Sequence, residues 1–89
     1  MTEARIELYF ALQVLKLGGK SYKWKGHGGA ADRIACLPDG SVWFVELKTK
    51  GGRVSALQKV FAADMKNHNY AVLWSREQVD AWCLDHTKT

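Results

Sequence analysis

The chain has 89 residues and 47% of them are hydrophobic, which suits one domain with a modest core and argues against a disordered chain. The formal net charge of +4 permits contact with phosphate backbones without requiring it. No apolar stretch reaches membrane-spanning length, and the chain does not start with an apolar signal core. These features predict a single domain over residues 1–89 that lies in the cytoplasm and does not bind membranes.

The first predicted element is a helix that Thr2 caps and that runs to about Leu17, where two glycines stop it. Apolar residues recur along this helix at helical spacing, so one of its faces should pack against the core. Glu7 and Glu3 precede Phe10 by about one and two turns on nearly the same line. We expect both acids to face the protein at least in part.

The rest of the chain alternates short strands with two further helices. The strands are predicted over 21–25, 32–37, 41–48 and 70–74. The helices open at Ser55 and Ser75, each with a glutamine three residues later in a capping-box pattern. A helical crossover between the last two strands makes those strands parallel. The expected fold class is α/β, a mixed four-stranded sheet flanked by helices in the order α-β-β-β-α-β-α.

Several apolar side chains are predicted to fill the core. On the helix after Ser55 the inward-facing set is Leu57, Val60, Phe61 and Met65. Three tryptophans also fall at core-facing positions, namely Trp43, Trp74 and Trp82. Cys36 and Cys83 lie far apart at apolar positions, so free thiols are expected in place of a disulfide or a zinc site.

The loop 38–40, with the sequence Pro-Asp-Gly, sets the register of the two strands that it joins. Proline suits the first position of a three-residue hairpin loop, and glycine suits its left-handed third position. Such a loop pairs Leu37 with Ser41, and counting back pairs Asp32 with Glu46. Opposed residues share one sheet face about 5 Å apart, whereas a two-residue turn would place the two carboxylates on opposite faces.

Lys48 lies two residues past Glu46 and so joins the two acids at one end of the sheet. Adjacent carboxylates repel each other and normally destabilise a sheet. A divalent cation relieves that repulsion, because hard ions such as Mg²⁺ prefer carboxylate and carbonyl oxygens. The alternative is that Lys48 merely neutralises the acids at a solvated strand end, and the tripeptide Glu-x-Lys alone is too common to decide.

Asp32 follows a glycine-rich segment, "VELK" ends the next apolar strand and "SALQ" opens the next helix. This combination resembles the PD-(D/E)XK nuclease superfamily, with its restriction-endonuclease-like core, and within it the VRR-NUC domain of short phage and bacterial proteins. The resemblance spans nearly the whole chain, from "TEARIE" to "YAVLWSREQVDAW". The chain departs from it at Ala31, where many members carry a proline that supplies no chemical group.

The resemblance implies a metal site and a catalytic lysine. Asp32 and Glu46 would hold Mg²⁺ or Mn²⁺, with the carbonyl of Leu47 as a further ligand. Lys48 would orient or help deprotonate the attacking water and stabilise the charge that develops on the phosphate.

Two further roles carry alternatives. Glu3 matches the helix glutamate that reaches the metal through water, with Glu7 as the second choice, but Glu3 could instead complement the helix dipole. Gln58 matches a glutamine that supports the lysine and positions substrate, but it could simply form a capping box with Ser55.

The activity implied by the resemblance is metal-dependent hydrolysis of DNA by an endonuclease that prefers branched substrates such as four-way junctions. A homodimer with paired sites suits such a junction, and the small size of the domain also favours dimerisation. Basic side chains that could contact the DNA backbone flank the expected metal site, namely Lys23, Lys25, Lys50 and Arg53.

The main alternative function is a non-catalytic DNA-binding module on the same fold. Such a module has no need for Asp32, Glu46 and Lys48 together, so the intact set favours the nuclease. The glycine-rich segment 26–31 lacks the lysine and hydroxyl of a P-loop, so no nucleotide cofactor is expected.

Overall fold

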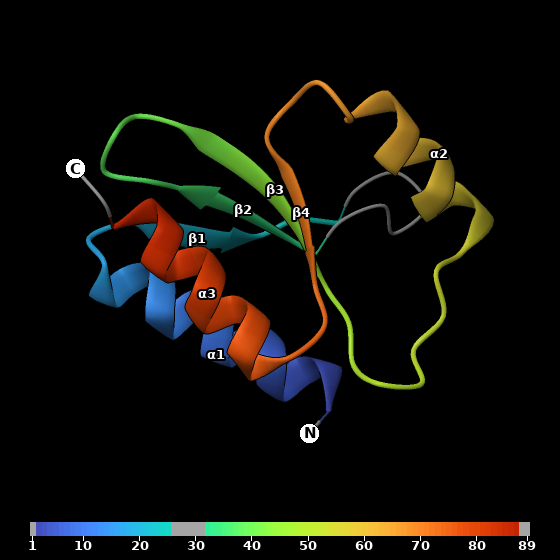
Figure 1. Ribbon diagram of the computed structural model, residues 1–89, viewed down its shortest axis with the longest axis horizontal. Helices are drawn as coiled ribbons and strands as arrows, with labels where there is room; N and C mark the ends of the chain where they lie inside the picture. Colours follow the sequence, from blue (N-terminus) through green and yellow to red (C-terminus); the bar gives the residue numbers. More distant parts are fainter. Residues whose placement is uncertain (1, 26–31, 88–89) are drawn as a thin grey trace.

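The computed structural model describes residues 2–25 and 32–87, in which the elements follow one another in the predicted order (Figure 1). The helices are α1 (Glu3–Lys16), α2 (Ala56–Asp64) and α3 (Arg76–His86). The strands are β1 (Lys20–Lys23), β2 (Arg33–Cys36), β3 (Val42–Leu47) and β4 (Tyr70–Leu73). The glycine-rich segment with Ala31 lies outside the described residues. In the described ranges no helix combines the length and the apolar character that crossing a membrane would require.

The four strands form one mixed sheet in the spatial order β1-β2-β3-β4. β1 pairs with β2 and β2 with β3 in antiparallel fashion, whereas β3 and β4 run parallel. The parallel pair is the one that the crossover through α2 predicts. Both the order of the elements and the mixed sheet are therefore confirmed.

The hairpin between β2 and β3 has the predicted three-residue loop. The N–H of Leu37 donates to the carbonyl of Ser41 at 2.9 Å, and Gly40 adopts a φ of 89°. A residue with a side chain would be strained at that positive φ, so glycine is the residue that fits this position of the loop without backbone strain. The pairs between β2 and β3 run from Cys36 opposite Val42 to Arg33 opposite Val45. The ladder therefore ends one residue before the predicted pair of Asp32 with Glu46.

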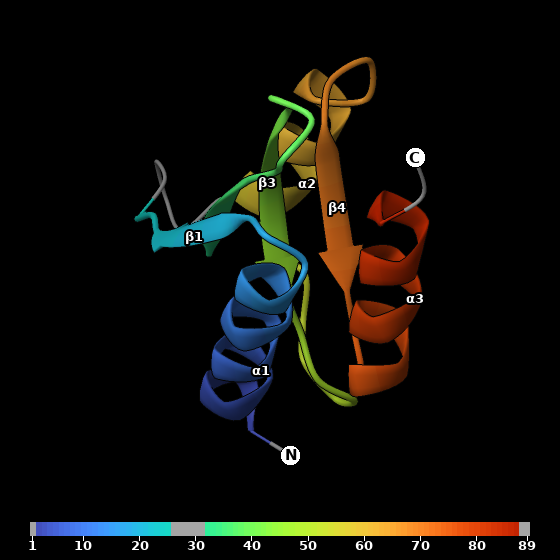
Figure 2. The same cartoon turned by 90° about the vertical axis from the view of Figure 1, so that its left-hand side faces the viewer.

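The core lies between the sheet and the two helices α1 and α3, which cover one face, while α2 lies against the other face (Figure 2). Phe10 of α1 is fully buried and its ring lies 5.4 Å from that of Trp82 on α3. Trp82 in turn meets the ring of Trp43 at 5.7 Å, so both tryptophans pack as predicted. Cys83 is buried, Cys36 is partly buried and both are free thiols.

The helix α2 buries only part of the face that the sequence predicts, because Phe61 and Met65 are partly buried whereas the other two predicted residues are not. Phe61 packs on Phe44 and Tyr70, with ring centroids 6.0 and 5.4 Å away. Leu57 and Val60 are exposed instead, so the prediction that they face inward is wrong. The physical reason is that α2 turns its Gln58 and Phe61 side toward the sheet, because Gln58 bonds to a buried polar group there.

Candidate active site

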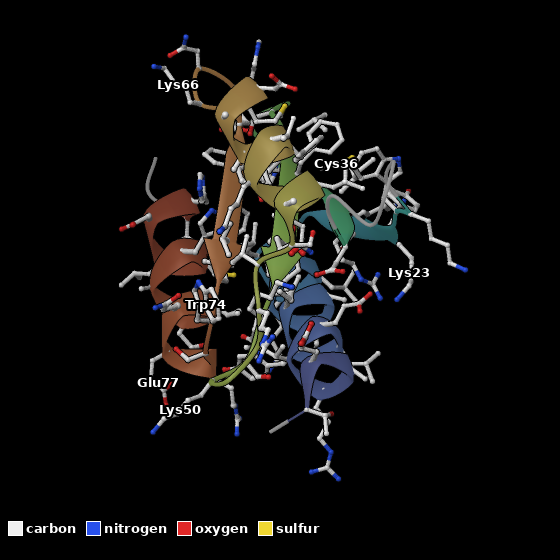
Figure 3. The ribbon with its side chains drawn as sticks, turned by 90° about the vertical axis from the view of Figure 1, so that its right-hand side faces the viewer. Lys23, Cys36, Lys50, Lys66, Trp74 and Glu77 are labelled. Carbon is white, nitrogen blue, oxygen red and sulfur yellow. The ribbon has the colours of Figure 1, made fainter. Side chains whose placement is uncertain are left out.

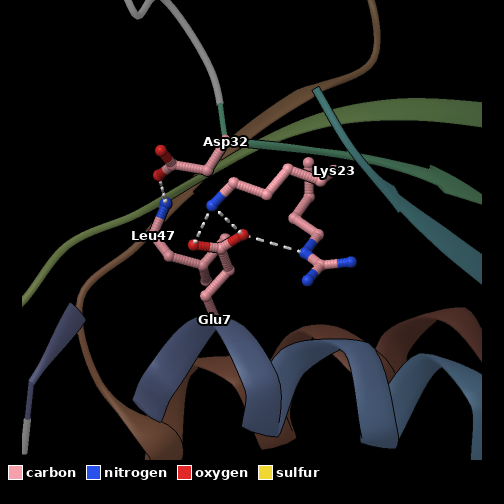
Figure 4. Close-up of polar contacts among 5 residues, drawn as sticks. Glu7, Lys23, Asp32 and Leu47 are labelled. Atoms are coloured by element: carbon pink, nitrogen blue, oxygen red, sulfur yellow. Dashed lines mark hydrogen bonds and ion pairs between the residues drawn. The ribbon is translucent and has the colours of Figure 1, made fainter. Parts of the chain in front are cut away.

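Asp32 lies at a bend just before β2, at the point where β2 and β3 separate. Its N–H donates to the carbonyl of Val45 at 3.1 Å, and its Oδ2 accepts a hydrogen bond of 2.8 Å from the N–H of Leu47 (Figure 4). The bend ends the regular ladder one residue before the predicted pair with Glu46. Burial raises the pKa of Asp32, the Leu47 hydrogen bond lowers it and the charge of Glu7 raises it again. Asp32 is thus an acid anchored against the end of β3.

Glu46 is the most unusual side chain of the sheet, because it is a carboxylate with only 2% of its surface exposed. Its Oε1 accepts a hydrogen bond from Gln58 Nε2, whereas its Oε2 is buried without a hydrogen-bond partner among the described residues. Burial raises the pKa of Glu46 to about 7, and the charge of Asp32 adds to the shift. The charges of the two acids therefore interact at this end of the sheet, although the predicted pair of Asp32 with Glu46 lies beyond the ladder, which ends at Arg33 opposite Val45.

Lys48 is buried beside Glu46, with Nζ 3.7 Å from Glu46 Oε1. Its ammonium also donates to the carbonyl of Arg53 at 2.9 Å, and its backbone N–H donates to the carbonyl of Leu73 at 2.9 Å. The positive charge of Lys48 lowers the pKa of Glu46, against the larger effects of burial and of Asp32. Both side chains are buried, so the alternative of a solvated strand end does not fit, although Lys48 does offset part of the charge of Glu46.

Gln58 forms the capping box that the sequence offered as one alternative, and its side-chain amide also contacts the buried acid Glu46. Its Oε1 accepts a hydrogen bond of 2.9 Å from the N–H of Ser55, and its own N–H donates to Ser55 Oγ at 3.1 Å. These two bonds make the capping box at the start of α2. The side-chain amide has its other end on Glu46. The cap therefore aims the amide of Gln58 at the buried carboxylate.

The two acids of α1 lie in different surroundings. Glu7 is 13% exposed and accepts hydrogen bonds from Lys23 Nζ at 3.0 and 3.2 Å and from Arg33 Nε at 3.1 Å (Figure 4). Glu3 is exposed, which differs from the partial burial expected, and its charge raises the pKa of Glu46. Glu7 is thus committed to two cations, whereas the carboxylate of Glu3 is the more accessible of the two.

Tyr70 is a neighbour of this pocket that the sequence reasoning missed. The pKa of its phenol is raised to about 12 by burial and by the charge of Glu46. Tyr70 pairs with Phe44 in the parallel ladder, and side chains two residues apart on a strand share a face. The alternation of β3 and β4 could therefore have placed Tyr70 on the Glu46 side of the sheet.

The donor set suits a hard divalent cation. Glu46 Oε2 is a buried oxygen that lacks a hydrogen-bond partner in the described residues, and burial and the charge of Asp32 raise the pKa of Glu46. No group of three His, Cys, Asp or Glu side chains gathers within the described ranges in a way that could hold a metal. Two carboxylates and a backbone carbonyl, completed by water and phosphate oxygens, are nevertheless a donor set that Mg²⁺ accepts.

Comparison with known proteins places this fold. A solved chain described as a VRR_NUC domain matches with a TM-score of 0.80 and 29% identity, over 97% of this chain and 98% of that chain. The curated protein "Putative nuclease p44" of Acyrthosiphon pisum secondary endosymbiont phage 1 is 38% identical over 58 residues, which are 63% of this chain and 62% of that protein. The chain thus spans less than two thirds of the length of this curated relative. No family model matches the chain.

The sheet, its helical cover and the acids at the end of β3 define a nuclease-like α/β domain. Its fold is that of a VRR-NUC domain, so the resemblance and the fold class predicted from the sequence are confirmed. The roles assigned to individual side chains remain predictions.

Proposed function

We propose that this protein is a metal-dependent deoxyribonuclease that hydrolyses phosphodiester bonds at the pocket formed by Asp32, Glu46 and Lys48. The observation that carries the proposal is the buried carboxylate of Glu46. It lies close to a second acid, carries an oxygen without a partner in the described residues and is approached by two nitrogen donors, Gln58 Nε2 and Lys48 Nζ. Stability alone would favour an apolar residue there, because burying charged groups costs free energy.

The residues that would hold Mg²⁺ or Mn²⁺ are Asp32, Glu46 and the carbonyl of Leu47, with Glu3 acting through water. When bound, such an ion stabilises negative charge on the phosphate and lowers the pKa of coordinated water. The N–H of Leu47 already anchors Asp32, and Gln58 anchors Glu46, so both carboxylates are oriented before an ion arrives.

Lys48 is proposed to contact a non-bridging oxygen of the scissile phosphate and the attacking water. The ammonium is held by the carbonyl of Arg53 and by Glu46, so it does not have to be ordered during the reaction. The water oxygen bonds to phosphorus as the bond to the 3′-oxygen breaks. The attacking water loses one proton, and the departing 3′-oxygen takes up one proton and leaves as a hydroxyl group.

The surface around the pocket offers cations for the DNA backbone. Lys23 and Lys50 lie on opposite sides of the view in Figure 3, with the end of β3 between them. Lys25 and Arg53 are exposed as well. Lys23 is partly neutralised by Glu7, whereas Lys50 has no ion pair within the described residues. These side chains would position the backbone without reading its sequence.

A homodimer is proposed from one apolar surface of α1 and β1, which we call the leucine stripe. It consists of Leu8, Leu12 and Leu15, with Tyr22 of β1 beside them, and all four are exposed. The leucines recur at spacings of four and three residues, which suits packing against a second helix. β1 is an edge strand whose free side could pair with its copy across a two-fold axis.

Branched DNA is proposed as the preferred substrate because two active sites related by a two-fold axis match the symmetry of a four-way junction. We also propose that the enzyme acts in the cytoplasm of a bacterial cell, where such DNA is found. Junction preference would appear as paired, symmetric cuts in opposite strands of the junction.

The test is incubation of the protein with end-labelled four-way junctions and with linear duplex in Mg²⁺ or Mn²⁺, followed by mapping of the cuts. Cleavage should need the ion, and Asp32→Ala or Lys48→Ala should lower its rate by about 100-fold or more. Asp64→Ala and Lys66→Ala are matched controls, because both side chains are exposed at or after the end of α2.

Equal activity in the native protein, Asp32→Ala and Lys48→Ala would overturn the assignment of the pocket. Binding of the junction without cleavage under all ionic conditions would support the non-catalytic DNA-binding module instead.

A further inference from the structure

A second cavity lies beside the proposed active site, between the loop that follows β3 and the start of α3. Its volume is about 340 Å³, and its lining includes Thr49 and Lys50 from the loop and Trp74, Arg76 and Glu77 from the start of α3. This volume is within the range of about 300–1,000 Å³ that is usual for small-ligand sites. Figure 3 shows Lys50, Trp74 and Glu77 gathered near the beginning of α3.

Trp74 stands apart from the other tryptophans. Trp43 and Trp82 pack on each other, and Trp24 packs on Phe44, whereas Trp74 makes no ring contact within the described part of the chain. Trp74 also lies outside the core cluster and is only partly buried, so the prediction that it packs in the core is wrong. Trp74 lines the cavity, and an indole that is not packed in the core can serve as a platform on which a base stacks.

The charges around Trp74 suit an anion joined to an aromatic ring. Lys50 and Arg76 supply two positive charges to the cavity wall, and Glu77 supplies one negative charge, which leaves a net positive lining. The guanidinium of Arg76 lies 4.5 Å from the ring centre of Tyr9, so it is already held in place. Tyr9 is itself fixed by a hydrogen bond of 2.5 Å to Asp80 Oδ1.

The cavity is next to the proposed chemistry in the chain and in space. Thr49 directly follows Lys48, and Trp74 directly follows the end of β4. The N–H of Lys48 bonds to the carbonyl of Leu73 at 2.9 Å, so the two strand ends are joined there. The carboxyl ends of parallel strands are the edge at which α/β sheets bind ligands.

We infer that this cavity is a nucleotide subsite for the DNA strand that continues from the scissile phosphate. Trp74 stacks on a base of that strand, and Lys50 and Arg76 contact its phosphates. The inference rests on the proposed nuclease function. It adds a binding site for an unpaired nucleotide next to the bond that is cleaved. A base can stack in this cavity only when it is free of a duplex partner, so the subsite favours the single-stranded or distorted DNA found near branch points.

The experiment measures binding of a fluorescently labelled single-stranded oligodeoxynucleotide by anisotropy in EDTA, where no cleavage is expected. Trp74→Ala should weaken binding by about 10-fold or more, whereas Trp74→Phe should retain most of the affinity because it keeps a stacking face. Lys50→Ala should reduce the slope of log K against log[salt] by about 0.7, the value for one phosphate contact on a single strand. Trp74→Ala should leave that slope unchanged.

Lys66→Ala is the matched control for Lys50→Ala, because it removes one exposed lysine far from the cavity (Figure 3). Native-like binding by Trp74→Ala and Lys50→Ala, in a protein that still cleaves DNA, would overturn the subsite and leave the nuclease proposal standing. A native protein that neither cleaves DNA nor binds the oligonucleotide would overturn both. Circular dichroism of each variant shows that a loss of binding is not a loss of fold.

Discussion

The side-chain amide of Gln58 links the cap of α2 to the buried carboxylate of Glu46 at the end of β3. One end of the amide accepts from the N–H of Ser55 at 2.9 Å, and the other end donates to Glu46 Oε1. A residue of the capping box at the start of the helix therefore also orients a carboxylate in the proposed active site. Substitution of Gln58 should affect both functions, and a second variant separates them.

We expect Gln58→Ala to lower the rate of DNA cleavage by about 10- to 100-fold, because residues that orient metal-binding carboxylates have effects of that size. Ser55→Ala removes the hydroxyl of the cap but leaves the Gln58 amide on Glu46, so it should cost about 1 kcal/mol of stability with little loss of rate. The measurements are single-turnover cleavage rates and urea unfolding of both variants. Equal loss of rate in the two variants would show that Gln58 matters only as a cap.

Stability of the metal-free protein should fall as the pH rises toward neutrality, because of Glu46. The folded protein keeps the proton of Glu46 up to its raised pKa of about 7, whereas the unfolded chain releases that proton near its ordinary value of 4.5. Between these values the folded state binds more protons than the unfolded state, so a rise in pH favours unfolding. Glu46→Gln carries no ionisable group there and should not show this loss.

The measurement is the melting temperature in EDTA between about pH 5 and pH 8, compared between the native protein and Glu46→Gln. Above pH 7 the addition of Mg²⁺ should raise the melting temperature of the native protein and have a smaller effect on Glu46→Gln, because an ion that binds only the folded state stabilises it. Parallel pH profiles for the two proteins would contradict the raised pKa of Glu46.

Local rules of turn geometry predicted the hairpin register well, whereas helix patterning predicted the start of α2 correctly and its buried face only in part. The loop 38–40 determines the hairpin register through short-range chemistry, so counting back along the strands correctly gave the pairs from Cys36 with Val42 to Arg33 with Val45 and put Asp32 near Glu46. The bend at Asp32 could not be derived by counting, because it arises where two strands separate and the ladder loses its regular bonds.

The error on α2 has a different physical origin. The spacing of apolar residues defines a stripe on a helix, but it does not show whether a neighbouring polar residue is buried in their place by a hydrogen bond to the interior. Gln58 turns inward because Glu46 offers it a buried acceptor, and Leu57 is left exposed as a result. Trp74 was misplaced for a related reason, since hydrophobic size predicts burial without indicating that a cavity lies in front of the ring.

Glu3 and Glu7 should separate into a metal-linked residue and a structural residue. Glu3→Gln should raise the Mg²⁺ concentration needed for half-maximal cleavage by about 10-fold, because its accessible carboxylate is near Glu46. Glu7→Gln should instead lower stability by about 1–3 kcal/mol, since it breaks charged hydrogen bonds to Lys23 and to the largely buried Arg33. Metal titrations and urea unfolding of both variants test this division. The reverse pattern would identify Glu7 as the acid that acts at the metal.

The leucine stripe should mediate assembly of two copies. Leu12 is at the middle of the stripe, so Leu12→Lys places a charge in the proposed interface and should convert the dimer to a monomer. Leu84→Lys is the matched control, because Leu84 is also an exposed helix leucine but lies on α3, away from the stripe. Sedimentation equilibrium gives the mass of each protein, and junction cleavage shows whether paired cuts require two copies. If the native protein and Leu12→Lys sediment with the same mass, the stripe is not the dimer surface.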